Sequence, residues 1–154
     1  MKKIVLFLIS ILMLTSCGDD EKNEKGNADV DAALVGTWTA DLSEDGVSYF
    51  EEMAIKSDGT FQTTSRITWL DPTEIEENGY TNGEVILTGK YSTSNNIIMM
   101  TVLKQRFKVD DGDWNEEAYT DGDYILSYGY VLDKNQLTLV NKNGGSGIYV
   151  RKNK

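Results

Sequence analysis

The feature that most constrains the fold is a series of turn signals that recurs roughly every ten residues. Each signal is a short polar run containing glycine or asparagine, residues that tolerate the positive φ angles of tight hairpin turns. The signals are Glu44-Asp45-Gly46, Ser57-Asp58-Gly59, Glu77-Asn78-Gly79, Thr81-Asn82-Gly83, Ser94-Asn95-Asn96, Asp110-Asp111-Gly112, Thr120-Asp121-Gly122, Asp133-Lys134-Asn135 and Asn143-Gly144-Gly145. The segments between them are rich in Val, Ile, Thr, Tyr and Phe, which predicts short antiparallel strands in a sandwich or barrel.

Residues alternate between two faces in several of these predicted strands, and one face must pack inward. The residues expected inside include Trp38, Tyr49, Glu51, Met53, Phe61, Trp69, Tyr91, Tyr124, Tyr128 and Tyr130. We therefore predict an all-β domain, an antiparallel up-and-down barrel of about eight strands. No stretch has a sustained helical period, and only residues 30–34 could form a helical turn. The long irregular stretch at residues 70–83 would lie at one mouth of the barrel, where it could act as a lid.

The segments before the predicted barrel have a different composition and divide the chain into three parts. Residues 1–16 begin with Met1-Lys2-Lys3 and continue into an apolar run, the pattern of a signal peptide. The run at residues 4–14 spans roughly 16 Å as a helix, too short for a hydrocarbon core of about 30 Å. Residues 17–33 are mostly charged and polar, which predicts a disordered acidic tether. The barrel domain is expected at residues 34–152.

The end of the signal peptide resembles the lipobox of bacterial lipoproteins, matched by Leu14-Thr15-Ser16-Cys17. The resemblance implies cleavage before Cys17, a diacylglycerol thioether on its sulfur, and fatty acyl chains such as palmitate that hold the protein on a membrane. The following Gly18-Asp19-Asp20-Glu21 resembles the acidic export signal of Bacteroidetes-type surface lipoproteins. That resemblance implies an outer-membrane protein displayed at the cell surface, with a periplasm-facing anchor as the alternative.

Motifs of the predicted domain resemble those of small bacterial lipocalin-like lipoproteins. The first is Leu34-Val35-Gly36-Thr37-Trp38, which is similar to the family's Gly-x-Trp signature. The other matches are Ser57-Asp58-Gly59-Thr60-Phe61, Gly89-Lys90-Tyr91-Ser92, Leu137-Thr138-Leu139 and Tyr149-Val150-Arg151-Lys152. The resemblance implies that Gly36 and Trp38 form the barrel floor and that Arg151 packs across the Trp38 ring. These three residues would then be structural and not part of a binding site.

The chain contains no histidine, which excludes Ser-His-Asp and Cys-His catalysis and histidine-based zinc or iron sites. The acidic run Asp110-Asp111-Gly112-Asp113 lacks the order of an EF-hand loop and is interpreted as a solvated loop. We predict no metal, no cofactor, no catalytic residue and no enzymatic activity. Glu51 is the one acid singled out, either as an inward ligand contact or reactive acid, or as a residue in water at the strand end.

The net charge of −10 repels phosphate backbones and anionic lipid headgroups, so nucleic acid is not expected as a partner and only the lipid would bind a membrane.

We predict a barrel that binds a small apolar or amphipathic ligand. The candidate ligand-binding residues are Tyr49, Glu51, Met53, Trp69, Tyr91, Tyr128 and Tyr130. In the alternative, the barrel is filled and acts as a structural or interaction subunit. Its loops at residues 70–83 and 110–122, with Trp69 and Trp114 exposed, would then contact a protein or glycan.

Overall fold

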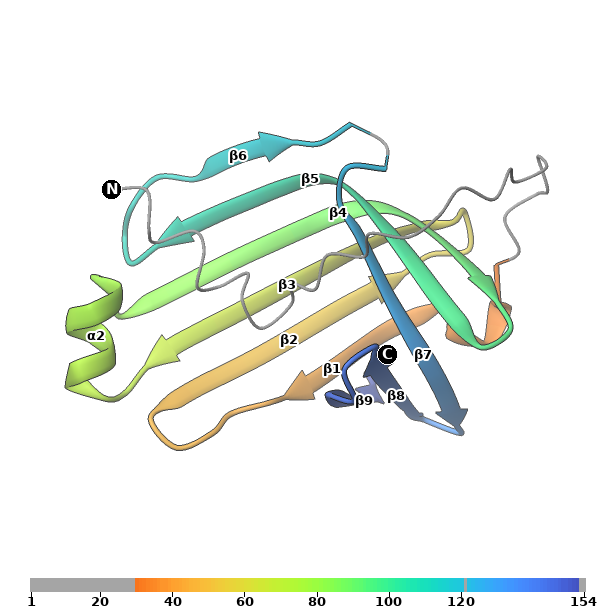
Figure 1. Ribbon diagram of the computed structural model, residues 1–154, viewed down its shortest axis with the longest axis horizontal. Coiled ribbons are helices and arrows are strands. Elements are labelled where there is room, and N and C mark those ends of the chain that lie inside the picture. The colour runs from red at the N-terminus through yellow and green to blue at the C-terminus, as the bar shows by residue number, and fades with distance from the viewer. Residues whose placement is uncertain (1–29, 121, 153–154) are drawn as a thin grey trace.

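The chain folds into one antiparallel sheet that curls round and closes into a barrel (Figure 1). The computed structural model describes residues 30–120 and 122–152. The predicted signal peptide at residues 1–16, the expected lipid attachment site Cys17 and residues 17–29 of the predicted tether lie outside the described residues. The predicted all-β barrel is confirmed.

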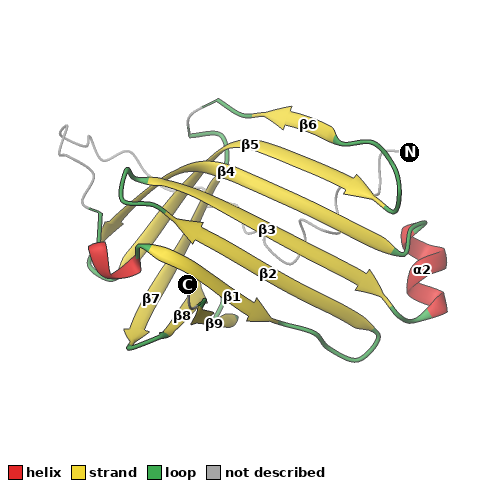
Figure 2. Cartoon of the chain, turned by 180° about the vertical axis from the view of Figure 1, so that it is seen from behind, coloured by secondary structure: helices red, strands yellow, loops and turns green. Residues whose placement is uncertain are grey.

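Eight strands close the barrel, and a ninth is added at its edge. The elements are η1 (Ala32–Leu34), β1 (Gly36–Asp41), β2 (Val47–Ile55), β3 (Thr60–Trp69), α2 (Pro72–Asn78), β4 (Asn82–Ser94), β5 (Ile97–Val109), β6 (Asn115–Ala118), β7 (Ile125–Asp133), β8 (Gln136–Asn141) and β9 (Ser146–Arg151). Strands β1 to β5 pair in sequence, β5 pairs with β7, and β7, β8 and β9 lead back to β1. Strand β6 pairs with the C-terminal half of β5, outside this closed circuit (Figure 2).

Several predicted turns join neighbouring strands as the sequence indicates. Asn95 and Asn96 have φ angles of 51° and 60° and form the two-residue connection between β4 and β5, the positive-φ geometry that suits the twist of a hairpin. Two predicted turns differ: Glu77-Asn78-Gly79 forms the end of helix α2, and Asn82 and Gly83 are the first residues of β4 and pair with β3. The Asn82 amide donates to the Asp110 carboxylate at 2.8 Å, which holds the start of β4 against the end of β5.

The stretch at residues 70–83 contains a short helix that the sequence pattern did not predict. Asp71 caps α2 by accepting a 2.8 Å hydrogen bond from the Thr73 amide, Pro72 opens it, and Gly79 ends it in the left-handed conformation. The helix has seven residues, about two turns, which is too short for a helical period to stand out. No helix of the described chain is long and apolar enough to span a membrane.

One end of the barrel is closed by η1 and the residues around it. Leu34 and Trp38 are fully buried, and the Trp38 indole N–H donates to the Leu34 carbonyl at 2.8 Å. The Arg151 guanidinium lies 4.2 Å from the centre of the Trp38 ring, the contact that the lipocalin-like resemblance implied. Arg151 also donates to the carbonyls of Val35 and Ala33, at 2.8 and 2.6 Å. Stacking and hydrogen bonds together fix η1 across the barrel end.

Gly36 is required by this closed end. Its φ angle of 151° belongs to a region that favours glycine, and a Cβ there would stand 2.7 Å from an Arg151 guanidinium nitrogen. The glycine of the Gly-x-Trp signature therefore leaves the space that Arg151 needs to reach the Trp38 ring.

Candidate functional site

A cavity of about 560 Å³ opens into the barrel from the end opposite η1. Its lining residues come from the strands and from the turns that join β1 to β2 and β8 to β9. They are Leu42, Ser43, Glu44, Val47, Tyr49, Glu51, Met53, Thr63, Ser65, Ile67, Trp69, Leu87, Met100, Leu126, Tyr128, Leu139, Asn141, Gly145, Ser146, Gly147 and Tyr149. Ser43, Glu44 and Ser146 are exposed as well as lining, so the cavity reaches solvent. Its volume lies within the range usual for small-molecule sites.

The register between β2 and β3 orders part of the wall from mouth to floor. Val47 lies opposite Trp69 near the mouth, Tyr49 opposite Ile67 comes next, and Glu51 opposite Ser65 follows. Met53 opposite Thr63 comes below, just above the floor level of Ile55 and Phe61. Glu51 therefore sits midway down the barrel. The buried Met53, Leu87, Met100, Leu126 and Leu139 supply the apolar part of the wall.

The half-buried Glu51 carboxylate is the centre of a hydroxyl network inside the barrel. One oxygen accepts hydrogen bonds from the Tyr49 hydroxyl at 3.0 Å and the Ser65 hydroxyl at 3.1 Å. The other accepts from the Tyr149 hydroxyl at 2.9 Å. An ionised carboxylate only accepts hydrogen bonds, so an arrangement of three donors suits it. Three strands, β2, β3 and β9, contribute to the network.

The tyrosines around Glu51 stay protonated well into the alkaline range. Burial, followed by the nearby Glu51 charge, raises the pKa of Tyr49, Tyr128 and Tyr149 above the ordinary value for tyrosine. A protonated phenol can donate to a carboxylate, whereas a phenolate would repel it. The tyrosine hydroxyls can therefore donate hydrogen bonds across the physiological pH range.

The structure brings together five of the seven residues that the sequence proposed for a ligand site. Tyr49, Glu51, Met53, Trp69 and Tyr128 all line the cavity. Tyr91 and Tyr130, also proposed from the sequence, are not among the residues that line it. They lie toward the closed end, where the Tyr91 hydroxyl donates to the Lys56 carbonyl at 2.9 Å and the Tyr130 hydroxyl donates to Asp31 at 2.9 Å. Alternation predicts which face a residue occupies, but it does not predict the depth along the barrel.

The sequence-based selection missed Tyr149, Ser65 and Thr63, all of which line the cavity. A signal for Tyr149 was present, because it alternates with Arg151 and must share its inward face. Ser65 and Thr63 share a face with Phe61 and Ile67 in β3, so the same rule applies to them. Small hydroxyl residues on an inward face are easily passed over, although they leave space and supply hydrogen-bonding groups.

The loop at residues 70–83, expected as a lid, contributes no residue to the lining of the cavity. Helix α2 lies at the ends of β3 and β4 (Figure 1). There Ile75 packs against a small second core of Ile67, Trp69 and Tyr80. Trp69 is only 8% exposed, contrary to the expectation of an exposed rim.

Two polar atoms of this second core, the Trp69 indole nitrogen and the Tyr80 hydroxyl, are buried without a hydrogen-bond partner. Burial raises the pKa of Tyr80, and the nearby Trp69 N–H opposes that rise without reaching hydrogen-bonding geometry. An unsatisfied buried group costs stability, so this core is less favourable than its apolar packing alone suggests.

The acidic loop after β5, around residues 110–114, makes contacts that hold neighbouring segments of the fold. Asp110 accepts hydrogen bonds from the amides of Thr81 and Asn82. Trp114 is half-buried, with Arg106 at 4.8 Å and Lys108 at 5.1 Å from its ring. Within residues 30–120 and 122–152, no three acidic, histidine or cysteine side chains gather in a way that could hold a metal ion.

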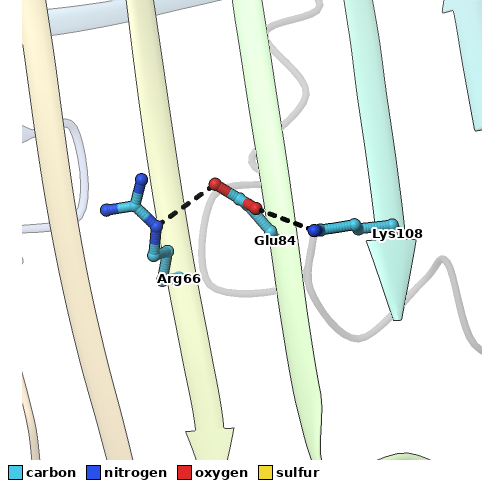
Figure 3. Close-up of polar contacts among 3 residues, drawn as sticks. All are labelled: Arg66, Glu84 and Lys108. Atoms are coloured by element: carbon cyan, nitrogen blue, oxygen red, sulfur yellow. Dashed lines mark hydrogen bonds and ion pairs between the residues drawn. The ribbon is translucent and has the colours of Figure 1, made fainter. Parts of the chain in front are cut away.

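The outer face of the long strands carries a charge network separate from the cavity. Glu84 of β4 pairs with Arg66 of β3 at 3.2 Å and with Lys108 of β5 at 3.5 Å (Figure 3). The Arg66 side chain is 56% exposed, and exposed pairs of this kind contribute little to stability. These ion pairs lie on the outer surface of the sheet and do not reach the barrel interior.

No known family model matches this chain, and no match is found among the curated proteins.

Proposed function

We propose that this protein is a non-catalytic binding protein that holds a small amphipathic ligand inside its barrel. The observation that carries the proposal is the solvent-connected cavity of about 560 Å³. Its deep wall is built from Met53, Leu87 and Met100, while Glu51 and its hydroxyl donors form a polar belt midway down. A mostly apolar pocket with a few fixed polar groups is typical of small-molecule sites.

A non-catalytic role is favoured by how the polar groups are used. The Glu51 carboxylate is tied to three hydroxyls, and the chain has no histidine to act as a neutral-pH base. The belt can therefore orient a ligand, whereas proton transfer or nucleophilic attack would have to break its hydrogen bonds.

We also propose that the protein is a lipocalin-like lipoprotein of the outer membrane, displayed at the cell surface and anchored through lipid on Cys17. The family proposal is supported by the closed barrel and by the Trp38–Arg151 contact at its floor. The anchor proposal is supported by the motif Leu14-Thr15-Ser16-Cys17. The described chain begins beside the floor, where the Asp31 amide donates to Thr93 at 3.0 Å. An anchor joined there would leave from the end opposite the mouth.

Native mass spectrometry tests the ligand proposal directly. A fragment of residues 18–154 omits the lipid-carrying cysteine and keeps the barrel, its floor and its core, all of which lie within residues 30–152. We expect a small-molecule adduct that is retained under gentle conditions and lost on denaturation. If the fragment stays free of adducts when purified from its native host and when mixed with extracts of that host, the proposal is wrong.

A second candidate function, that of an interaction subunit, is favoured by an aliphatic patch on the outside of the barrel. The patch consists of exposed, outward residues of four neighbouring strands: Ile97, Met99, Ile125, Val131, Val140, Ile148 and Val150. Thr138 lies between Val131 and Ile148 in the register, so the middle of the patch is uncharged. Exposed apolar patches often mark interaction sites. The loops at residues 70–83 and 110–122 are less suited to contact a partner, since Trp69 is buried and the ring of Trp114 is covered by cations.

The occupant that we propose for this patch is a second copy of the chain. Copies that each carry a net charge of −10 repel one another, and an uncharged face is where they can meet at least cost. Sedimentation analysis of the 18–154 fragment should show a dimer that Val131→Lys disrupts. A monomer at all concentrations would reject this candidate.

A further inference from the structure

The charges on the cavity wall all have one sign. Its charged side chains are the carboxylates of Glu44 and Glu51, and no lysine or arginine stands among the lining residues. Glu44 lies at the exposed mouth and Glu51 lies midway down. A ligand entering this cavity therefore passes one carboxylate and arrives at another.

Glu51 has no protein counter-charge in the described chain. The ion pairs of residues 30–120 and 122–152 involve other acids, namely Glu52, Glu84 and Glu116. Its hydrogen bonds all come from neutral hydroxyls. A carboxylate held in a partly desolvated site without a cation is costly, and a bound cation relieves that cost.

The belt around Glu51 offers acceptors to a cation. A carboxylate has about four acceptor positions, and three are occupied by Tyr49, Ser65 and Tyr149. The oxygens of these hydroxyls keep lone pairs that a ligand N–H could use. The rings of Tyr49, Tyr128 and Tyr149 also line the cavity, and aromatic faces attract organic cations.

We propose that the ligand is an organic cation, an ammonium group joined to an apolar body, with the ammonium beside Glu51 and the apolar body against Met53, Leu87 and Met100. This inference rests on the proposed function, because it names the class of ligand for the same cavity. A carboxylate or phosphate ligand is disfavoured, since it would place a second negative charge next to Glu51 in a poorly solvated space.

The test compares three ligands that differ only in their polar end: octylammonium, octanol and octanoate. Each is titrated at neutral pH against the 18–154 fragment loaded with N-phenyl-1-naphthylamine, a neutral dye that fluoresces in apolar sites. We expect octylammonium to displace the dye at a concentration at least about tenfold below that of octanol, as one charge-assisted hydrogen bond allows. Octanoate should be the weakest of the three.

Two matched variants assign the preference to Glu51. Glu51→Gln should abolish the advantage of octylammonium over octanol. Glu52→Gln makes the same change on the next residue, whose carboxylate pairs with Lys152 at 2.7 Å outside the cavity, and should keep the advantage. If Glu51→Gln does not fold, the order of the three ligands on the unmodified chain decides the question.

The outcomes separate the two proposals. Equal displacement by octylammonium and octanol, or stronger displacement by octanoate, overturns the organic-cation inference while leaving a ligand-binding cavity. Failure of the dye and of all three ligands to bind overturns the proposed function, and the inference falls with it.

Discussion

The Tyr149 hydroxyl donates a 2.9 Å hydrogen bond to Glu51 although the two residues are 98 positions apart in the chain. Their strands, β9 and β2, are the two neighbours of β1, so the bond passes over β1 on the inside of the barrel. It joins the last strand to the second and defines the polar belt of the cavity.

Tyr149→Phe removes this donor and leaves Glu51 with the hydroxyls of Tyr49 and Ser65. We expect a loss of about 1.5–3 kcal/mol in the free energy of unfolding, as for other hydrogen bonds to charged groups. Urea denaturation measures it. Tyr80→Phe is the matched control, because its buried hydroxyl has no partner. Removing that hydroxyl should leave stability unchanged or slightly raised, and equal losses in both variants would show that the Tyr149–Glu51 hydrogen bond does not stabilise the barrel.

Arg151→Met tests the floor of the barrel. The substitution removes the hydrogen bonds to the carbonyls of Ala33, in η1, and of Val35, just after it, together with the stacking on Trp38. We expect a loss of at least about 2 kcal/mol in the free energy of unfolding. The comparison is Arg66→Met, which removes an exposed arginine of the surface network and should change stability by less than about 1 kcal/mol. A floor variant as stable as the surface variant would show that Arg151 is dispensable.

Gly36→Ala should also destabilise the floor, by about 1–3 kcal/mol, because its φ angle is unfavourable for alanine and the new Cβ meets Arg151. Gly129→Ala provides the contrast. Gly129 has no positive φ angle, and a Cβ there meets only an ordinary contact at 3.9 Å, so its replacement should be neutral or mildly stabilising. Thermal unfolding measures the stability of both variants, and only Gly36→Ala should have a lowered midpoint.

Alkaline pH should unfold the protein. All eight tyrosines of the chain have raised pKa values in the folded state, with burial as the first cause. Below the ordinary tyrosine pKa of about 10, folded and unfolded states hold the same phenolic protons, so stability is fully present. Above it the unfolded state loses protons first, and each still-protonated buried tyrosine costs about 1.4 kcal/mol per pH unit.

Tyrosinate absorbance and circular dichroism should therefore change together above pH 10, as the phenols ionise on unfolding. Gradual ionisation of the tyrosines between pH 9 and 10, with the fold intact, would contradict the burial described for the barrel interior.

The sequence predicted the architecture well because the signals were local. Turn residues and period-two alternation specified the barrel and its inward faces, and Trp38 and Arg151 are placed as their motifs implied. The depth of Tyr91 and Tyr130 was not predictable, because strand tilt sets depth and no local pattern encodes it. The Tyr149–Glu51 hydrogen bond could not be predicted either, because it depends on how barrel closure brings distant strands together. Helix α2 was missed because its caps, and not a period, define it.

A fluorescence titration of N-phenyl-1-naphthylamine into the 18–154 fragment and two variants tests directly whether the barrel interior binds a ligand. Tyr128→Trp enlarges a side chain that lines the cavity, whereas Gln62→Trp enlarges an exposed side chain on the outside of β3, away from the aliphatic patch. We expect one dye molecule per chain, a loss of at least about tenfold in affinity for Tyr128→Trp, and no change for Gln62→Trp. No binding to the unmodified fragment, or equal affinity in all three proteins, would contradict a ligand site inside the barrel.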